Sequence, residues 1–145
     1  MPSERSEKRD VTDRQSDVGH DAVVTKRSPW SLAETLARLS AVVAARGMEV
    51  FAVIDHSGNA RDVGLDLRDT KLVIFGSPSA ATPVIEAAPL AALDLPLRVV
   101  VWEDGYQTRV SYQAPAVVAR RYGLHGDVPD ALAGIDALIA AVINR

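Results

Sequence analysis

The chain has 145 residues, of which 48% are hydrophobic and 24% charged, so one domain with a buried core is expected. Its net charge is −3 and its basic residues are scattered, which argues against a nucleic-acid partner. The absence of cysteine excludes disulfides, thiolate metal ligands and a cysteine nucleophile.

The sequence also bears on location. No apolar run approaches the roughly 20 residues that a membrane span needs, and residues 1–15 lack the apolar segment of a secretory signal. We therefore expect a cytoplasmic protein that does not contact a membrane. Residues 1–21 contain almost no large apolar side chains to offset the entropy of ordering, so we expect a flexible N-terminal tail before one domain over residues 22–145.

The domain is expected to begin with a strand at Val23–Lys26 and a helix that starts near Ser31. Ser31 and Glu34 have the S-x-x-E spacing of a capping box. Apolar residues then recur at helical spacing until Gly47, which is typical of a helix end. A strand, a helix and a strand in close succession predict a right-handed crossover with parallel flanking strands.

The next strand, Met48–Asp55, is apolar on both faces, as in an interior strand. The polar sequence Asp55-His56-Ser57-Gly58-Asn59 follows it. Open α/β sheets bind ligands at the carboxyl ends of strands, so Asp55, His56 and Ser57 are candidate ligand-binding residues and His56 is a candidate general base. The alternative is that Asp55 or Ser57 caps a short helix while His56 bonds a backbone carbonyl.

A second candidate region follows the strand Leu72–Phe75. Residues 76–81 form a loop of small residues, and Thr82 and Pro83 have the N-cap and N1 character of a helix start. Such a loop can offer backbone amides to an anion. Ser77 is a candidate ligand-binding residue because this loop is expected to supply a wall of the Asp55–Asn59 site through it. It has no lysine, arginine or phosphate-binding glycine motif, so a plain strand-to-helix connection is the alternative.

Asp94-Leu95-Pro96 is expected to form a corner before the next strand. Asp94 either accepts backbone amides in this turn or is an acid that faces His56. Tyr112 completes the set of candidate acid and base residues, which are His56, Asp94 and Tyr112.

Asp104-Gly105 predicts a tight hairpin between the strands Leu97–Glu103 and Tyr106–Tyr112. We expect this hairpin to lie half exposed at an edge of the sheet and to offer a dimer surface.

Two helices are expected after the hairpin. The first begins at Pro115 and ends near Tyr122, and the second opens at Pro129. The second has an apolar stripe formed by Leu132, Ile135, Leu138, Ile139 and Val142. No two histidines or acids have ligand spacing on one helix face, so we expect no metal site, and nothing indicates a cofactor.

Three stretches together resemble the DUF302 family: FAVIDHSGNARDVGLDL, LVIFGSPSAATPVIEAAPLAALDLPLRVVVWED and VSYQAPAVVARRYGL. The resemblance implies an α+β fold, a two-layer α/β sandwich in the order β-α-β-β-α-β-β-α-α, with a mixed sheet and helices on one face. It also implies a homodimer but no known activity. Where the family commonly reads FGNPKxGTP, this chain has Ser77, Ser79 and Ala81 in place of the asparagine, the lysine and the second glycine, so the charge that would favour an anion is missing.

Three functions follow from these patterns. The first is a non-catalytic domain that binds a small molecule or a partner and acts as a homodimer. The second is a small enzyme that uses His56 for acid/base chemistry with Asp94 or Tyr112, which requires His56 in a concave pocket within about 3 Å of a carboxylate or phenol. The third is a structural self-association module.

Overall fold

The computed structural model describes residues 22–124 and 129–145. The expected N-terminal tail, residues 1–21, lies outside the described residues. The elements in chain order are β1 (Val23–Ser28), α2 (Leu32–Ala45), β2 (Glu49–Asp55), α3 (His56–Asp62), β3 (Thr70–Gly76), α4 (Pro78–Ala87), the 3-10 helix η1 (Pro89–Asp94), β4 (Leu97–Asp104), β5 (Gln107–Gln113), α5 (Pro115–Arg121), α6 (Asp130–Ala133) and α7 (Ile135–Ile143). The expected α+β class is confirmed, with α3 and η1 added and the last helix divided at Gly134.

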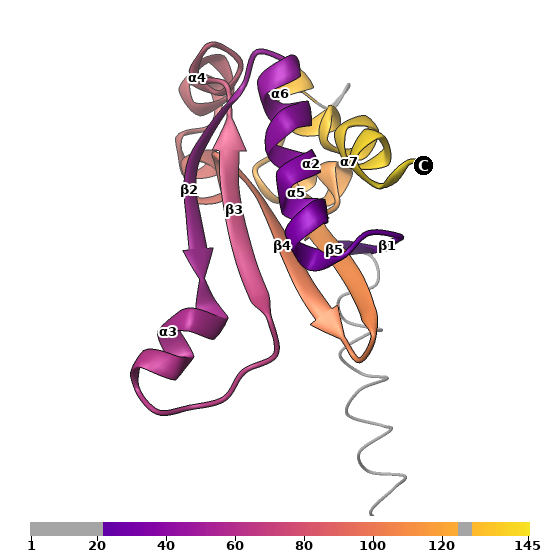
Figure 1. The fold of residues 1–145 in the computed structure, drawn as a ribbon. Helices are drawn as coiled ribbons and strands as arrows, with labels where there is room; N and C mark the ends of the chain where they lie inside the picture. Colours follow the sequence, from indigo (N-terminus) through magenta and orange to yellow (C-terminus); the bar gives the residue numbers. More distant parts are fainter. Residues whose placement is uncertain (1–21, 125–128) are drawn as a thin grey trace, which may run out of the picture.

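The five strands form one sheet in the order β1-β5-β4-β3-β2, and every neighbouring pair is antiparallel. The expected mixed sheet is therefore wrong. Helix α2 carries the chain from one edge of the sheet to the other, and the later strands fill the space between (Figure 1). Because each neighbouring pair in the order β1-β5-β4-β3-β2 is antiparallel, the two edge strands β1 and β2 run in the same direction without pairing.

Two strand positions differ from expectation. Strand β2 is an edge strand, not an interior one, and its Phe51 and Val53 side chains are 45% and 52% exposed. The pairing register of β2 shifts at Phe51, which is the mark of a β-bulge. The β4–β5 hairpin forms as predicted, with Gly105 at φ +63°, but it lies inside the sheet because β1 and β3 pair with its outer sides.

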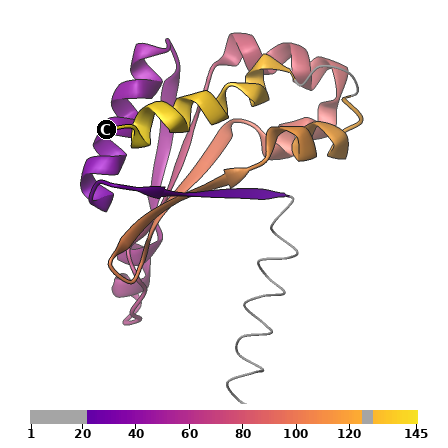
Figure 2. The same ribbon diagram turned by 90° about the vertical axis from the view of Figure 1, so that its right-hand side faces the viewer.

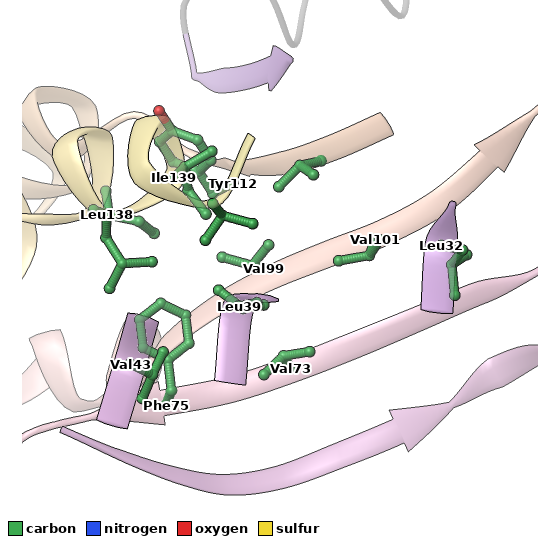
Figure 3. Close-up of a cluster of buried hydrophobic side chains, with 13 residues drawn as sticks. Leu32, Leu39, Val43, Val73, Phe75, Val99, Val101, Tyr112, Leu138 and Ile139 are labelled. Atoms are coloured by element: carbon green, nitrogen blue, oxygen red, sulfur yellow. The ribbon is translucent and has the colours of Figure 1, made fainter. Parts of the chain in front are cut away.

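The main core lies between one face of the sheet and helices α2 and α7, which cover the same face (Figure 2). Val73, Val99 and Tyr112 are cross-strand neighbours at its centre. Figure 3 shows these side chains facing Leu39 and Val43 of α2 and Leu138 and Ile139 of α7. All five residues of the predicted C-terminal stripe, Leu132, Ile135, Leu138, Ile139 and Val142, are buried.

The start of helix α2 agrees with the prediction from its capping residue, whereas the start of helix α4 does not. Ser31 caps α2 by accepting a hydrogen bond from the Glu34 amide at 3.1 Å, as its spacing predicts. Helix α4 begins at Pro78 instead of Pro83, with Ser77 as its N-cap. The chain has two Ser/Thr-Pro pairs here, and the first starts the helix, so Thr82 lies within the helix and its hydroxyl donates to the Pro78 carbonyl at 2.7 Å.

Candidate functional site

Asp55 and Ser57 hold the start of α3. The Asp55 carboxylate accepts the Gly58 amide at 2.9 Å and the Ser57 hydroxyl at 2.6 Å, and Lys71 lies 3.3 Å away. These contacts, led by the Ser57 hydrogen bond, hold the pKa of Asp55 well below its usual range. Ser57 is buried and also accepts the Thr70 amide at 3.3 Å. Asp55 thus caps α3, as the alternative sequence interpretation proposed, although α3 starts at His56, and Ser57 links the Asp55 carboxylate to the Thr70 amide.

His56 is the first residue of α3, and it is exposed. Within the described residues its side chain makes no hydrogen bond, and it is not among the residues that line the apolar pocket described below. In residues 22–124 and 129–145, neither the carboxylate or phenol that the enzyme hypothesis requires nor the backbone carbonyl of the alternative interpretation bonds the imidazole.

Asp94 lies at the other end of the sheet from His56. Strands β2 and β4 run in the same direction, since both pair antiparallel with β3. His56 follows the last residue of β2, whereas Asp94 precedes the first residue of β4. The expectation that Asp94 faces His56 is therefore wrong.

The Asp94 carboxylate instead joins four elements. It accepts hydrogen bonds from Arg98 at 2.9 Å, Gln113 at 2.9 Å and Arg121 at 2.8 Å, and one from the Tyr122 hydroxyl. Burial opposes ionisation here, but the hydrogen bonds from Tyr122, Gln113 and Arg121 outweigh it and lower the pKa of Asp94 to about 2. The carboxylate fixes the corner before β4 to β5 and α5.

Tyr112 is a core residue. Its side chain is 3% exposed, and its hydroxyl donates to the Asp136 carboxylate of α7. Burial, together with the Asp136 hydrogen bond and charge, raises the pKa of Tyr112 far above its usual value. The three candidate acid and base residues, His56, Asp94 and Tyr112, thus lie at three separate places.

Ser77, expected to form a wall of the Asp55–Asn59 site, lies at the opposite end of β2 from Asp55, because Gly76 pairs with Glu49 whereas Lys71 pairs with Asp55. That expectation is therefore wrong, and Ser77 lies at a separate cavity. An apolar pocket of about 260 Å³ opens between α4, the start of β2, the end of β3 and the corner before β4. It is lined by Met48, Phe51, Gly76, Ser77, Pro78, Ala80, Ala81, Thr82, Ile85, Leu95, Pro96, Leu97 and Ala131. None of these side chains titrates, so the pocket offers apolar contact and not acid/base chemistry.

The sequence forms the pocket through two corners that meet. Phe75 of β3 opposes Leu97 of β4, which places the Gly76-Ser77-Pro78 turn against Leu95 and Pro96. The two corners lie close together at Gly76, where an added Cβ atom would be in ordinary van der Waals contact, 3.5 Å from the Pro96 Cβ atom and 3.9 Å from the Phe51 ring. The sequence marks both proline corners, but only the β3–β4 register brings them together.

The polar groups at the pocket are few. The Ser77 hydroxyl makes no helix-capping bond and lies 3.0 Å from the Ser79 hydroxyl at the exposed start of α4. The Thr82 hydroxyl is already bonded to a carbonyl. Ligand sites combine a mainly apolar lining with a few polar groups that orient the ligand, and Ser77 and Thr82 are the two hydroxyl side chains in this lining.

Two further observations concern the described residues alone. Residues 22–124 and 129–145 contain no group of three or more histidine or acidic side chains placed to hold a metal ion. No helix in these ranges has the length and apolar character needed to cross a bilayer.

One family model matches most of the chain. The model of the family described as "Domain of unknown function DUF302" matches residues 24–142. The chain is 39% identical over 109 residues to two proteins named "Fluoride-specific ion channel FluC 1", from Brucella suis and Brucella abortus, covering 73% of this chain but 43% and 40% of those proteins. It thus spans less than half the length of these relatives.

A solved structure shows the same fold. It is the crystal structure of an uncharacterized conserved DUF302 protein from Bacillus stearothermophilus. The TM-score is 0.72 at 20% sequence identity, over 84% of this chain and 95% of that chain. At this identity the likeness supports the fold and not a shared ligand.

Proposed function

The chain belongs to the DUF302 family, whose description assigns no activity, and we propose that it is a non-catalytic domain that binds a small apolar molecule and acts as a homodimer. The apolar pocket beside α4 supports the proposed binding of a small apolar molecule. At about 260 Å³ it is slightly smaller than most drug-sized sites and larger than an engineered apolar cavity of about 150 Å³ that holds benzene. A ligand of one or two rings, or a short alkyl chain, fits this volume.

The separation of the candidate acid and base residues supports a non-catalytic role. General acid/base catalysis needs a side chain within hydrogen-bond reach of the reacting group and of its partner. His56 is exposed at one end of the sheet, Asp94 is held by two arginines at the other end, and Tyr112 is in the core. The contacts of Asp94 and Tyr112 are those of structural residues.

A ligand screen tests the binding proposal. The probes are toluene, indole and linear alcohols from 1-butanol to 1-octanol, and the readout is the thermal unfolding midpoint. A probe at 100 times its Kd stabilises the fold by about 2.7 kcal/mol, which raises the midpoint of a domain of this size by roughly 10 °C. We expect at least one probe to give a saturable increase, and no increase with any probe would contradict the proposal.

Two leucine substitutions on one helix locate the binding. Ala81→Leu places extra methyl groups in the pocket, whereas Ala87→Leu adds the same atoms at an exposed position of α4 outside it. We expect Ala81→Leu to abolish the effect of the probe and Ala87→Leu to retain it. Equal responses of both variants would mean that the probe binds elsewhere.

The free edge of the sheet supports the homodimer. Strand β2 pairs only with β3, so its outer backbone groups are open to pairing, and Val53 is 52% exposed beside this edge. We expect sedimentation equilibrium to give a dimer that Val53→Lys weakens. The matched variant Val23→Lys, on the opposite edge strand, should leave the dimer intact. A monomer at high protein concentration would contradict the homodimer.

The same edge favours the second candidate, a self-association module without a ligand. Two results together would distinguish this candidate. Val53→Lys would weaken the dimer, and none of the apolar probes would raise the thermal unfolding midpoint of the protein.

A further inference from the structure

The loop that joins α3 to β3 exposes three large apolar side chains. Val63, Leu65 and Leu67 alternate along it and are 72%, 63% and 46% exposed. Together with α3 this loop forms an arm, residues 56–69, which runs outward from the end of β2 on the side away from β3 before it returns to β3 (Figure 1). Contiguous exposed apolar side chains mark an interaction surface.

Hydrogen bonds set the shape of the arm. Gly64 follows α3 at φ +79°, and across it the Leu65 amide donates to the Ala60 carbonyl at 2.9 Å. Such helix ends commonly bring the residue after the glycine against a side chain of the last turn, but Ala60 is too small to cover Leu65. At the other end of the arm, the Glu103 amide donates to the Asp69 carbonyl at 2.9 Å. The leucines are thus held in exposed positions before a partner arrives, which reduces the entropy lost on binding.

The apolar pocket adjoins the free edge of the sheet. Phe51 belongs to the edge strand β2, lines the pocket and is 45% exposed. The pocket lies at the amino end of β2, whereas the arm follows its carboxyl end. The seven residues of β2 separate the two by roughly 20 Å. An arm therefore does not reach the pocket of its own chain.

The two-fold symmetry of a homodimer places the arm of one chain at the pocket of the other. Two copies of β2 that pair about a two-fold axis lie antiparallel, because a two-fold axis along the strands would set N–H groups opposite N–H groups. The carboxyl end of one β2 then lies beside the amino end of the other. Each arm is thereby brought to the partner's pocket, and the same contact occurs twice in the dimer.

We propose that in the homodimer Leu65 and Leu67 of each arm occupy the apolar pocket of the other protomer, and that an apolar ligand enters by displacing them. This inference rests on the proposed function, since it needs both the pairing of the β2 edges and the pocket. Of the described residues that line the pocket, none is charged, so leucine side chains enter it without burying an unpaired charge. The arm and the ligand exclude each other, so each weakens the binding of the other to the same extent.

Cysteine cross-linking tests the contact directly, because the chain has no cysteine of its own. The Leu65→Cys protein is mixed with the Ala81→Cys protein, whose introduced thiol lies in the pocket, and the mixture is oxidised by air. We expect a covalent dimer on a non-reducing gel, and excess 1-hexanol should suppress it. The matched mixture of Leu65→Cys with Ala87→Cys, at an exposed position of α4 outside the pocket, should give little covalent dimer. Equal cross-linking of the two mixtures, no cross-linking in either, or no effect of 1-hexanol would overturn the proposal.

Sedimentation equilibrium separates this inference from the proposed function. We expect Leu65→Ser to raise the dimer Kd at least about tenfold, because an apolar side chain loses its burial in both contacts. Leu90→Ser, at a position that is 70% exposed and outside the pocket, should leave the Kd unchanged. If the dimer forms and the apolar probes bind, but Leu65→Ser leaves the dimer Kd unchanged, this inference is wrong and the proposed function stands. A protein that is monomeric at high concentration overturns both.

Discussion

Asp94→Asn measures how strongly one carboxylate holds the corner beside the apolar pocket. Asparagine keeps the size of the side chain and resembles a protonated aspartic acid, so it removes the charge and little else. The carboxylate is 10% exposed and its pKa falls from 3.8 in the unfolded chain to about 2 in the fold. This difference corresponds to about 2 kcal/mol of stability at pH 7.

The direction of the pKa shift determines how the contribution of Asp94 to stability depends on pH. Because the folded pKa lies below the unfolded one, the contribution of Asp94 is complete above pH 3.8 and is lost as the pH falls through about 2. Urea unfolding at several pH values should therefore show Asp94→Asn to be about 2 kcal/mol less stable than the unmodified protein at pH 7, with a gap that closes between pH 4 and pH 2. Asp66→Asn, at an exposed position, is the control and should change stability little. A gap at pH 7 below about 0.5 kcal/mol, the range of ordinary surface substitutions, would refute this reasoning.

Three further outcomes are expected from urea unfolding and ligand binding. Gly58→Ala should destabilise the protein, because the added Cβ atom would lie 2.5 Å from the Asp55 carboxylate. Gly134→Ala should stabilise it by up to about 1 kcal/mol, because Gly134 has helical backbone and its added Cβ atom would meet only a carbonyl at 3.7 Å. Stability changes of the same sign in both variants would contradict the capping role of Asp55. Tyr112→Phe should cost about 1 kcal/mol, because it removes the hydrogen bond to Asp136 and keeps the buried ring, and no loss would show that this bond does not anchor α7. Asp94→Asn should also weaken probe binding, because Leu95 and Pro96, which follow it, form a wall of the pocket; unchanged affinity would mean that the wall does not depend on Asp94.

Local features could be predicted from the sequence because their causes lie within a few residues. Ser31 accepts the Glu34 amide at the start of α2, and Gly105 takes the positive φ that the hairpin turn needs. The buried C-terminal stripe follows directly from its spacing. Each depends on neighbours along the chain and not on which strands pair.

The sheet order could not be predicted, because it depends on contacts between distant segments. Strand β2 is apolar on both faces and so resembles an interior strand, yet it lies at the edge with Val53 half exposed. The rule that ligands lie at the carboxyl ends of strands belongs to parallel sheets. In this antiparallel sheet it pointed to Asp55 and His56, whereas the apolar pocket lies at the opposite end of β2.

The family resemblance supplied the fold but only part of the candidate site. Ser77 was predicted as a wall of the Asp55–Asn59 site, but it lines the apolar pocket at the other end of β2. Met48, Phe51 and Ile85 have no polar chemistry that would mark them in a sequence, and the β2, β3 and α4 contacts alone make them neighbours.

The most direct test of the proposed function is methyl NMR during a titration with indole. Ala80, Ala81 and Ile85 line the pocket, and Ala87 of the same helix is exposed outside it. We predict saturable shifts of the methyl signals of the three lining residues, with the Ala87 signal unchanged. Shifts confined to residues near His56, or no saturable shift at any of the three lining residues, would contradict the proposal that this pocket is the binding site.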